Sequence, residues 1–184
     1  MYHTYTGKIF DPLNVEALEV DIKDIAHALS QVTRYNGHLE QPYTVAQHSL
    51  LVADLVENHY KRPDLAIQAL LHDASEAYLP DIPTDIKVTL PDFIALENRL
   101  HKHIANALGI KYPFDPIVKE VDRLVQGCEV VSFQTWEPWV TPPFSRHLFC
   151  MSHKHAESAF LDLYYELTGI GEGRWSGLNY LTTL

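Results

Sequence analysis

Four ionisable residues stand where the sequence otherwise predicts buried helix surface: His48, His72, Asp73 and Asp122. The adjacent pair, His72 and Asp73, lies in LAIQALLHDASEAYL, which is apolar on nearly all sides. Ionisable groups are costly to bury without a partner. A divalent ion suits all four, because Zn²⁺, Mn²⁺, Co²⁺ and Fe²⁺ accept imidazole nitrogen together with carboxylate oxygen. We therefore expect one divalent transition metal (Zn, Co or Mn), held by these four side chains.

Helical spacing supports this expectation. Adjacent residues on a helix point about 100° apart, so His72 and Asp73 can both reach an ion at the helix surface. Glu76 follows three residues after Asp73 and shares its face. A lone His-Asp pair is more often a core histidine beside a solvated acid. His48 and Asp122, each on another predicted helix, favour the metal site.

The elements that must position these residues are predicted to be helices. Apolar stripes at helical spacing alternate with signals of helix starts and ends, such as Thr44 and Ser152 as caps and Gly109 as a terminator. The predicted helical segments cover residues 21–36, 44–60, 63–79, 84–88, 93–108, 116 to beyond 125, and 152–167. Residues 1–19 are predicted to form an extended arm, and residues 168–184 a C-terminal tail. The sequence thus predicts an all-α domain of six or seven helices with little β-structure.

Composition narrows the class of protein. The 184 residues suit a single domain spanning 1–184, and 46% of them are hydrophobic, enough for a sizeable core. The formal net charge of −10 argues against a polymeric nucleic acid as partner. No stretch approaches the ~20 apolar residues of a membrane span, and the N-terminus does not resemble a signal peptide. With Cys128 and Cys150 expected as reduced thiols, we expect a cytoplasmic protein with no membrane partner.

The order His48, His72-Asp73, Asp122 resembles the H…HD…D signature of the HD-domain metal-dependent phosphohydrolases. Arg34, Glu76 and the run DIPTDIK from Asp81 to Lys87 resemble the 5′-deoxynucleotidase branch of that family. The stretches TYTGKIFDPLN, IAHALSQVTRYNGH and YTVAQHS are similar to small phage and prophage members, which include dATP triphosphohydrolases. The resemblance covers roughly residues 4–125 and implies a single HD-domain helical bundle.

The resemblance also implies roles for individual residues. Glu76 would orient or deprotonate the attacking water, and Asp81 would protonate the leaving sugar oxygen. Arg34 would clamp phosphate with its planar guanidinium. The further candidates for substrate contact are Tyr35, Lys87 and His38; a solvated Lys87 and an ordinary loop histidine at position 38 are the alternatives.

Two reactions are compatible with these residues. A deoxynucleoside triphosphate triphosphohydrolase, with dATP favoured, would release deoxynucleoside and triphosphate, whereas a 5′-deoxynucleotidase would release deoxynucleoside and phosphate. The phage-like N-terminal stretches favour the triphosphohydrolase. A non-catalytic nucleotide-binding module and the hydrolysis of cyclic nucleotides or alarmones are further alternatives.

The remaining chemistry-bearing residues are expected to be structural. Histidines two residues apart on a helix point to different faces, so the following pairs are predicted to be solvated: His101 with His103, and His153 with His155. His27 is expected to pack or to reach solvent. The aromatic residues of the proline-broken loop 136–144 are predicted to form an oligomer contact or a small satellite core, and we expect a homo-oligomer, a dimer or hexamer.

Overall fold

The apolar stripes of the sequence form helices in the computed structural model, which describes residues 1–133 and 148–170. In these ranges the α-helices are α1 (Ile22–Gln31), α2 (Val45–Asp54), α3 (Ala66–Leu70), α4 (Thr84–Lys87), α5 (Pro91–Ala107), α6 (Pro116–Phe133) and α7 (His153–Thr168). A π-helical turn, η3 (Leu55–His59), extends α2. Shorter 3-10 turns are η1 (Val15–Ala17), η2 (Arg34–Gly37), η4 (Pro63–Leu65) and η5 (Ala74–Ala77). The prediction of an all-α fold is confirmed.

The N-terminal arm forms the small amount of β-structure that was expected. Strands β1 (Tyr2–His3) and β2 (Ile9–Phe10) pair antiparallel, with Tyr2 opposite Phe10. Tyr2 donates a hydrogen bond from its hydroxyl to the carbonyl oxygen of Tyr78, at 2.6 Å, which ties the arm to the segment after η5.

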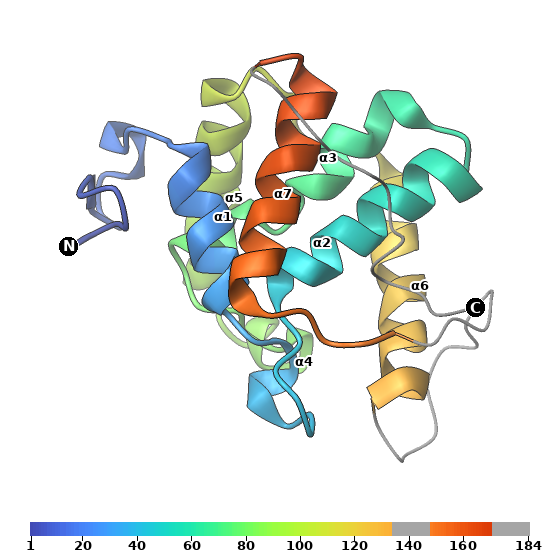
Figure 1. The fold of residues 1–184 in the computed structure, drawn as a ribbon. Coiled ribbons are helices and arrows are strands. Elements are labelled where there is room, and N and C mark those ends of the chain that lie inside the picture. Colours follow the sequence, from blue (N-terminus) through green and yellow to red (C-terminus); the bar gives the residue numbers. More distant parts are fainter. Residues whose placement is uncertain (134–147, 171–184) are drawn as a thin grey trace.

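Helix α7 is central to the packing. It contacts α1, α2 and α3, while α2 also contacts α3 and α6 (Figure 1). Among the largest fully buried side chains are Leu50 of α2, Leu70 of α3 and Phe160 of α7, so the core lies where these helices meet. Of the helices in the described ranges, none combines the length and hydrophobicity that a membrane crossing requires.

Several predicted helix ends are confirmed. The Thr44 hydroxyl accepts a hydrogen bond from the backbone N–H of Gln47 at 3.2 Å, and Ser152 caps α7 in the same way. Gly109, just after α5, has a φ of +70°, which glycine adopts without steric cost. The loop 136–144 and most of the predicted tail lie outside the described residues.

The first helix ends earlier than predicted. Helix α1 stops at Gln31, not at Asn36, because Val32 is extended and Thr33 forms a β-bridge with Thr44. The backbone N–H of Arg34 donates to the Tyr43 carbonyl oxygen at 2.9 Å. These contacts bring the end of α1 next to the start of α2 and place Arg34 beside that start.

The prediction of one continuous helix over residues 63–79 is wrong. Helix α3 ends at Leu70, η5 begins only at Ala74, and His72 and Asp73 lie in the turn between them. The His72 ring hydrogen-bonds through Nδ1 to the Ala69 carbonyl oxygen at 2.7 Å. In a continuing helix that oxygen would accept the N–H of Asp73, so the imidazole occupies the acceptor that the next helical turn needs.

Substitution of the cap residue Thr44 tests how much its hydroxyl stabilises α2. Because alanine and serine differ here only by the hydroxyl, we expect Thr44→Ala to have a free energy of unfolding about 1 kcal/mol lower than Thr44→Ser. Urea denaturation of both variants measures the difference. Equal midpoints and slopes for the two variants would show that the hydroxyl does not stabilise α2.

Candidate metal centre

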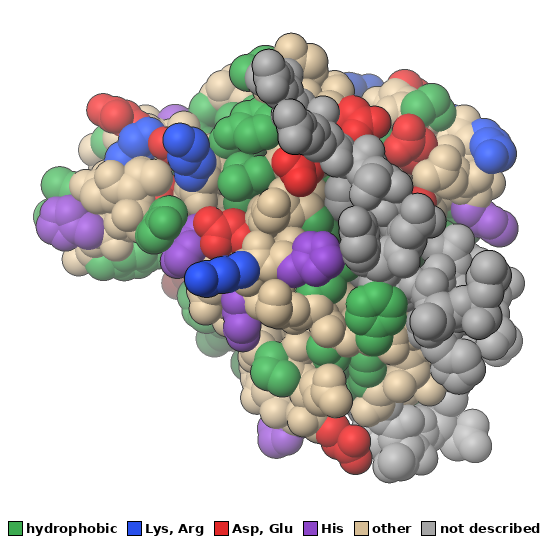
Figure 2. Space-filling model, in the orientation of Figure 1, with side chains coloured by type: hydrophobic (Ala, Val, Ile, Leu, Met, Phe, Trp, Pro, Cys, Tyr) green, Lys and Arg blue, Asp and Glu red, His purple; other side chains and the backbone are tan. Residues whose placement is uncertain are grey.

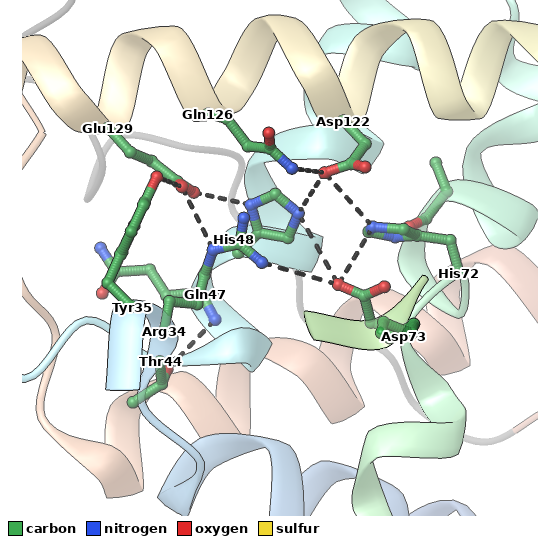
Figure 3. A network of polar contacts seen from close by, with 12 residues as sticks. Arg34, Tyr35, Thr44, Gln47, His48, His72, Asp73, Asp122, Gln126 and Glu129 are labelled. Atoms are coloured by element: carbon green, nitrogen blue, oxygen red, sulfur yellow. Dashed lines mark hydrogen bonds and ion pairs between the residues drawn. The ribbon is translucent and has the colours of Figure 1, made fainter. Parts of the chain in front are cut away.

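Four side chains from three parts of the fold converge at one point. His48 comes from the middle of α2, His72 and Asp73 from the turn after α3, and Asp122 from α6 (Figure 3). The Asp122 Oδ1 atom lies 3.1 Å from His48 Nε2 and 3.9 Å from His72 Nε2. The Asp73 Oδ2 atom lies 3.2 Å from His72 Nε2 and 3.8 Å from His48 Nε2. The structure therefore brings together all four residues that the sequence nominated as ligands.

The hydrogen bonds of the two imidazole rings decide which nitrogen faces the centre. His48 Nδ1 lies 2.6 Å from Glu129 Oε1, and His72 Nδ1 lies 2.7 Å from a backbone carbonyl oxygen. Because a carbonyl oxygen only accepts, the Nδ1 atom of His72 carries the hydrogen. A neutral ring bonded in this way presents the Nε2 lone pair, the form in which histidine ligates a metal.

The four converging side chains are two imidazoles and two carboxylates, and none of them is a permanent cation. Both Nε2 atoms are buried without a hydrogen bond of acceptable geometry, although carboxylate oxygens lie 3.1 to 3.9 Å away. Burial and Arg34 oppose protonation of His48, but Glu129 and Asp122 outweigh them and raise its pKa to about 9. The same field would attract a divalent cation, which would displace the added proton and leave the Nε2 lone pair for the ion. Two inward lone pairs with two carboxylates therefore fit a transition metal of the zinc or cobalt type.

Both carboxylates are suited to act as ligands. Burial opposes ionisation of Asp73, but the His72 and His48 rings and Arg34 hold its pKa well below the usual range. Burial likewise opposes ionisation of Asp122, and His48 lowers its pKa overall. The His48 side chain is fully buried, whereas 20% of the Asp73 and 24% of the Asp122 side chain is exposed. The centre is thus closed behind the histidines and open on the carboxylate side.

Glu76 and Asp81 form a second pair of acids within electrostatic reach of the centre. Burial, with the charges of Asp73 and Asp81, raises the pKa of Glu76 well above its usual value. Burial also raises the pKa of Asp81. The Glu76 Oε2 atom is buried without a hydrogen-bond partner. A raised pKa favours the protonated form of a carboxyl group, which is the form that a general acid needs.

Arg34 and Tyr35 lie beside the centre on η2. The buried Arg34 guanidinium bonds through Nε to Glu129 Oε2 at 3.1 Å, and its Nη1 lies 3.8 Å from Asp73 Oδ2. Tyr35 donates from its hydroxyl to the same Glu129 oxygen at 2.8 Å. Arg34 is therefore placed where a phosphate bound near Asp73 would meet it.

The other two candidates for substrate contact differ in position. Lys87 is half-buried and pairs with Glu97 at 2.8 Å. Burial opposes its charge, but Glu97, with Glu76 and Asp73 nearby, raises its pKa overall. His38 is exposed at the end of η2, and no hydrogen bond or ion pair found in the described part of the chain joins its side chain to the four candidate ligands. The structure thus places Lys87 near the acids but not His38.

Glu129 is a site residue that the sequence analysis missed. Its fully buried carboxylate contacts His48, Arg34 and Tyr35. Burial opposes its ionisation, but Arg34 and His48 lower its pKa overall. The missed signal was spacing, because Glu129 follows Asp122 by seven residues and two helical turns place it on the same face of α6 (Figure 3).

The prediction of solvated histidines is wrong for three of the four residues. His101 is half-buried beside the rings of Tyr112 and Phe114, with its Nε2 atom out of contact with solvent, and burial lowers its pKa. The other two bond backbone carbonyl oxygens of distant segments: His103 at 2.8 Å and His153 at 2.6 Å. His27 packs as expected, stacked on Tyr5 with ring centroids 3.7 Å apart. These histidines serve the packing of helices.

Comparison with known proteins gives relatives but no activity. No protein-family model matches the chain. A protein of Escherichia coli (strain K12) described as "Uncharacterized protein YfdR" is 36% identical over 126 residues, which cover 68% of each chain. An uncharacterized protein of Rhodobacter capsulatus is 31% identical over 134 residues, covering 69% of this chain and 66% of its own. Neither description states a ligand or a reaction.

Loss of one carboxylate should abolish metal binding. In Asp73→Ala, two imidazoles and one carboxylate remain and the negative charge at the centre falls, so we expect Co²⁺ bound after dialysis to drop from about one ion per chain to near zero. Asp85→Ala, which removes an exposed carboxylate on α4, is the matched control. Retention of one ion per chain by Asp73→Ala would refute the ligand assignment.

Proposed function

The chain belongs to the family of the Escherichia coli protein YfdR, and we propose that it is a metal-dependent phosphohydrolase of 2′-deoxynucleotides. The observation that carries the proposal is the convergence of two buried imidazole Nε2 atoms and two carboxylates, with a second pair of acids nearby. The resemblance of this ligand order to the HD-domain phosphohydrolases supports the same reaction class.

In this proposal the ion is held by the four converging side chains: His48, His72, Asp73 and Asp122. A divalent ion bound there lowers the pKa of water and polarises a phosphoryl oxygen. The partly exposed carboxylates leave an open side through which a phosphate ester can enter.

In this proposal two acids of the protein each carry out one proton transfer. Glu76 takes a proton from the attacking water as the water oxygen bonds to the α-phosphorus. The bond between that phosphorus and the 5′ oxygen of the sugar breaks, and Asp81 gives a proton to the departing oxygen. Arg34 balances the charge on the phosphoryl oxygens. The raised pKa values of Glu76 and Asp81 support a shared proton on this pair.

We favour a triphosphate substrate, with dATP first, over the monophosphate of a 5′-deoxynucleotidase. The phage-like N-terminal stretches support this choice, and Lys87 is the cation in the best position to meet a longer polyphosphate. Arg62, by contrast, is exposed and bonds Asp64 through two nitrogens, at 2.9 and 2.7 Å. The buried, unpartnered oxygen of Glu76 favours an enzyme over a non-catalytic module, which has no need of it.

A small-molecule substrate also agrees with the surface charge. On the face drawn in Figure 2, the Lys and Arg side chains of the described residues are scattered among acidic and apolar ones rather than gathered into a patch. The proposal further includes a homo-oligomer (dimer or hexamer) in the cytoplasm of a bacterium or a phage-infected host.

A product assay tests this function. Metal-loaded protein is incubated with the mono- and triphosphates of the four deoxynucleosides, and products are separated by ion exchange, with chelator-treated protein as the control. We expect deoxyadenosine and intact triphosphate from dATP. Orthophosphate from monophosphates alone would instead establish the 5′-deoxynucleotidase, and turnover of neither group with any metal would refute the phosphohydrolase.

Variants of the acid pair should separate catalysis from metal binding. Because neither acid is a ligand, we expect Glu76→Ala and Asp81→Ala to bind one Co²⁺ per chain but to lower kcat by about 10²- to 10⁴-fold. Glu19→Ala removes an exposed carboxylate and serves as control for turnover. Unchanged kcat in either acid variant would remove that residue from the mechanism.

A further inference from the structure

The buried carboxylate of Glu129 contacts both functional halves of the site. We infer that Glu129 is a positioning residue which fixes the nitrogen that His48 presents to the metal and, through its other oxygen, holds Arg34 and Tyr35 toward the substrate. This inference rests on the proposed metal centre and adds a residue to it. Glu129 touches neither metal nor substrate, so its effect acts through these three side chains.

The first half of the inference concerns His48. Its Nδ1 atom lies 2.6 Å from Glu129 Oε1, and both side chains are fully buried. An ionised carboxylate only accepts hydrogen bonds, so it selects the ring form with hydrogen on Nδ1 and the lone pair on Nε2. That lone pair is the one aimed at Asp122 and Asp73.

The second half concerns the turn that carries Arg34 and Tyr35. Tyr35 and Asn36 both have left-handed backbone, with φ of 56° and 51°, a conformation that costs energy in residues other than glycine. Such a turn persists only where its surroundings hold it. Glu129 Oε2 accepts from Arg34 Nε at 3.1 Å and from the Tyr35 hydroxyl at 2.8 Å, and so holds the side chains of two consecutive residues of that turn.

The contacts also indicate why the residue is glutamate rather than glutamine. Three donors, from His48, Arg34 and Tyr35, point at its two oxygens. A glutamine has a single oxygen, and its NH₂ group would face a donor on one side. Glu129→Gln therefore keeps the size of the side chain but disturbs either the histidine or the arginine.

Binding measurements on the full chain test the inference. We expect Glu129→Gln to weaken Co²⁺ binding by about 10- to 100-fold, followed by visible absorption. We also expect it to weaken binding of inorganic phosphate by about tenfold, the size of one charge-assisted contact. Glu120→Gln makes the same chemical change on the exposed side of α6 and should match the wild type.

The outcomes separate this inference from the proposed function. Wild-type affinities for both probes in Glu129→Gln, even with a lowered Tm, would overturn the positioning role and leave the metal centre intact. A wild-type protein that binds no Co²⁺ would instead refute the metal centre, and equal phosphate affinities of the two proteins would then overturn the inference as well.

A spectroscopic measurement on the wild type does not depend on the variant folding. In the Zn²⁺-loaded protein, ¹⁵N–¹H correlation of the histidine rings should show His48 with hydrogen on Nδ1 and none on Nε2. Hydrogen on Nε2 of His48 would overturn the inference.

Discussion

Burial of unbalanced charge is the constraint on which this site depends. Two imidazoles and three carboxylates meet between α2, α6 and the turn after α3, and Arg34 is the buried cation that faces them. Groups of this kind are costly to remove from water unless each has a partner. Glu129 is satisfied by its three donors, whereas the Nε2 atoms of His48 and His72 are not. A cation bound at that point would give both nitrogens a partner.

The fold serves this centre through its irregular elements as much as through its long helices. The crossing between α1 and α2 brings Arg34 next to the start of α2. The cap Thr44, four residues before His48, fixes where that helix begins. The break after α3 turns His72 and Asp73 toward α6 together. If the chain were regular helix at either place, these side chains would point in different directions around the helix axis.

Much of the fold could be predicted from the sequence, because apolar periodicity and caps are local signals. The starts of α2 and α7 and the end of α5 are as expected. The end of α1 and the break after Leu70 were not predictable, because they depend on a bridge to Thr44 and on a side-chain bond to a carbonyl oxygen. Such contacts form only in the folded chain and override helix propensity.

The candidate site also contains residues that the sequence predicts and residues that it does not. The four candidate ligands were predictable because each interrupts an apolar pattern, and their order carries a family resemblance. The spacing of Glu129 from Asp122 places it on the same face of α6, but its partners lie 81 and 95 residues away in the chain, so which groups it contacts emerges only from the packing. The His101 ring, expected in solvent, is half-buried because Tyr112 and Phe114 pack against it.

Anomalous diffraction from crystals of the Zn²⁺-loaded protein tests the central claim most directly. The account predicts one peak per chain, about 2.0 to 2.2 Å from His48 Nε2, His72 Nε2 and oxygens of Asp73 and Asp122. A peak bound elsewhere, or fully ordered side chains that bond only to one another with no peak between them, would contradict it.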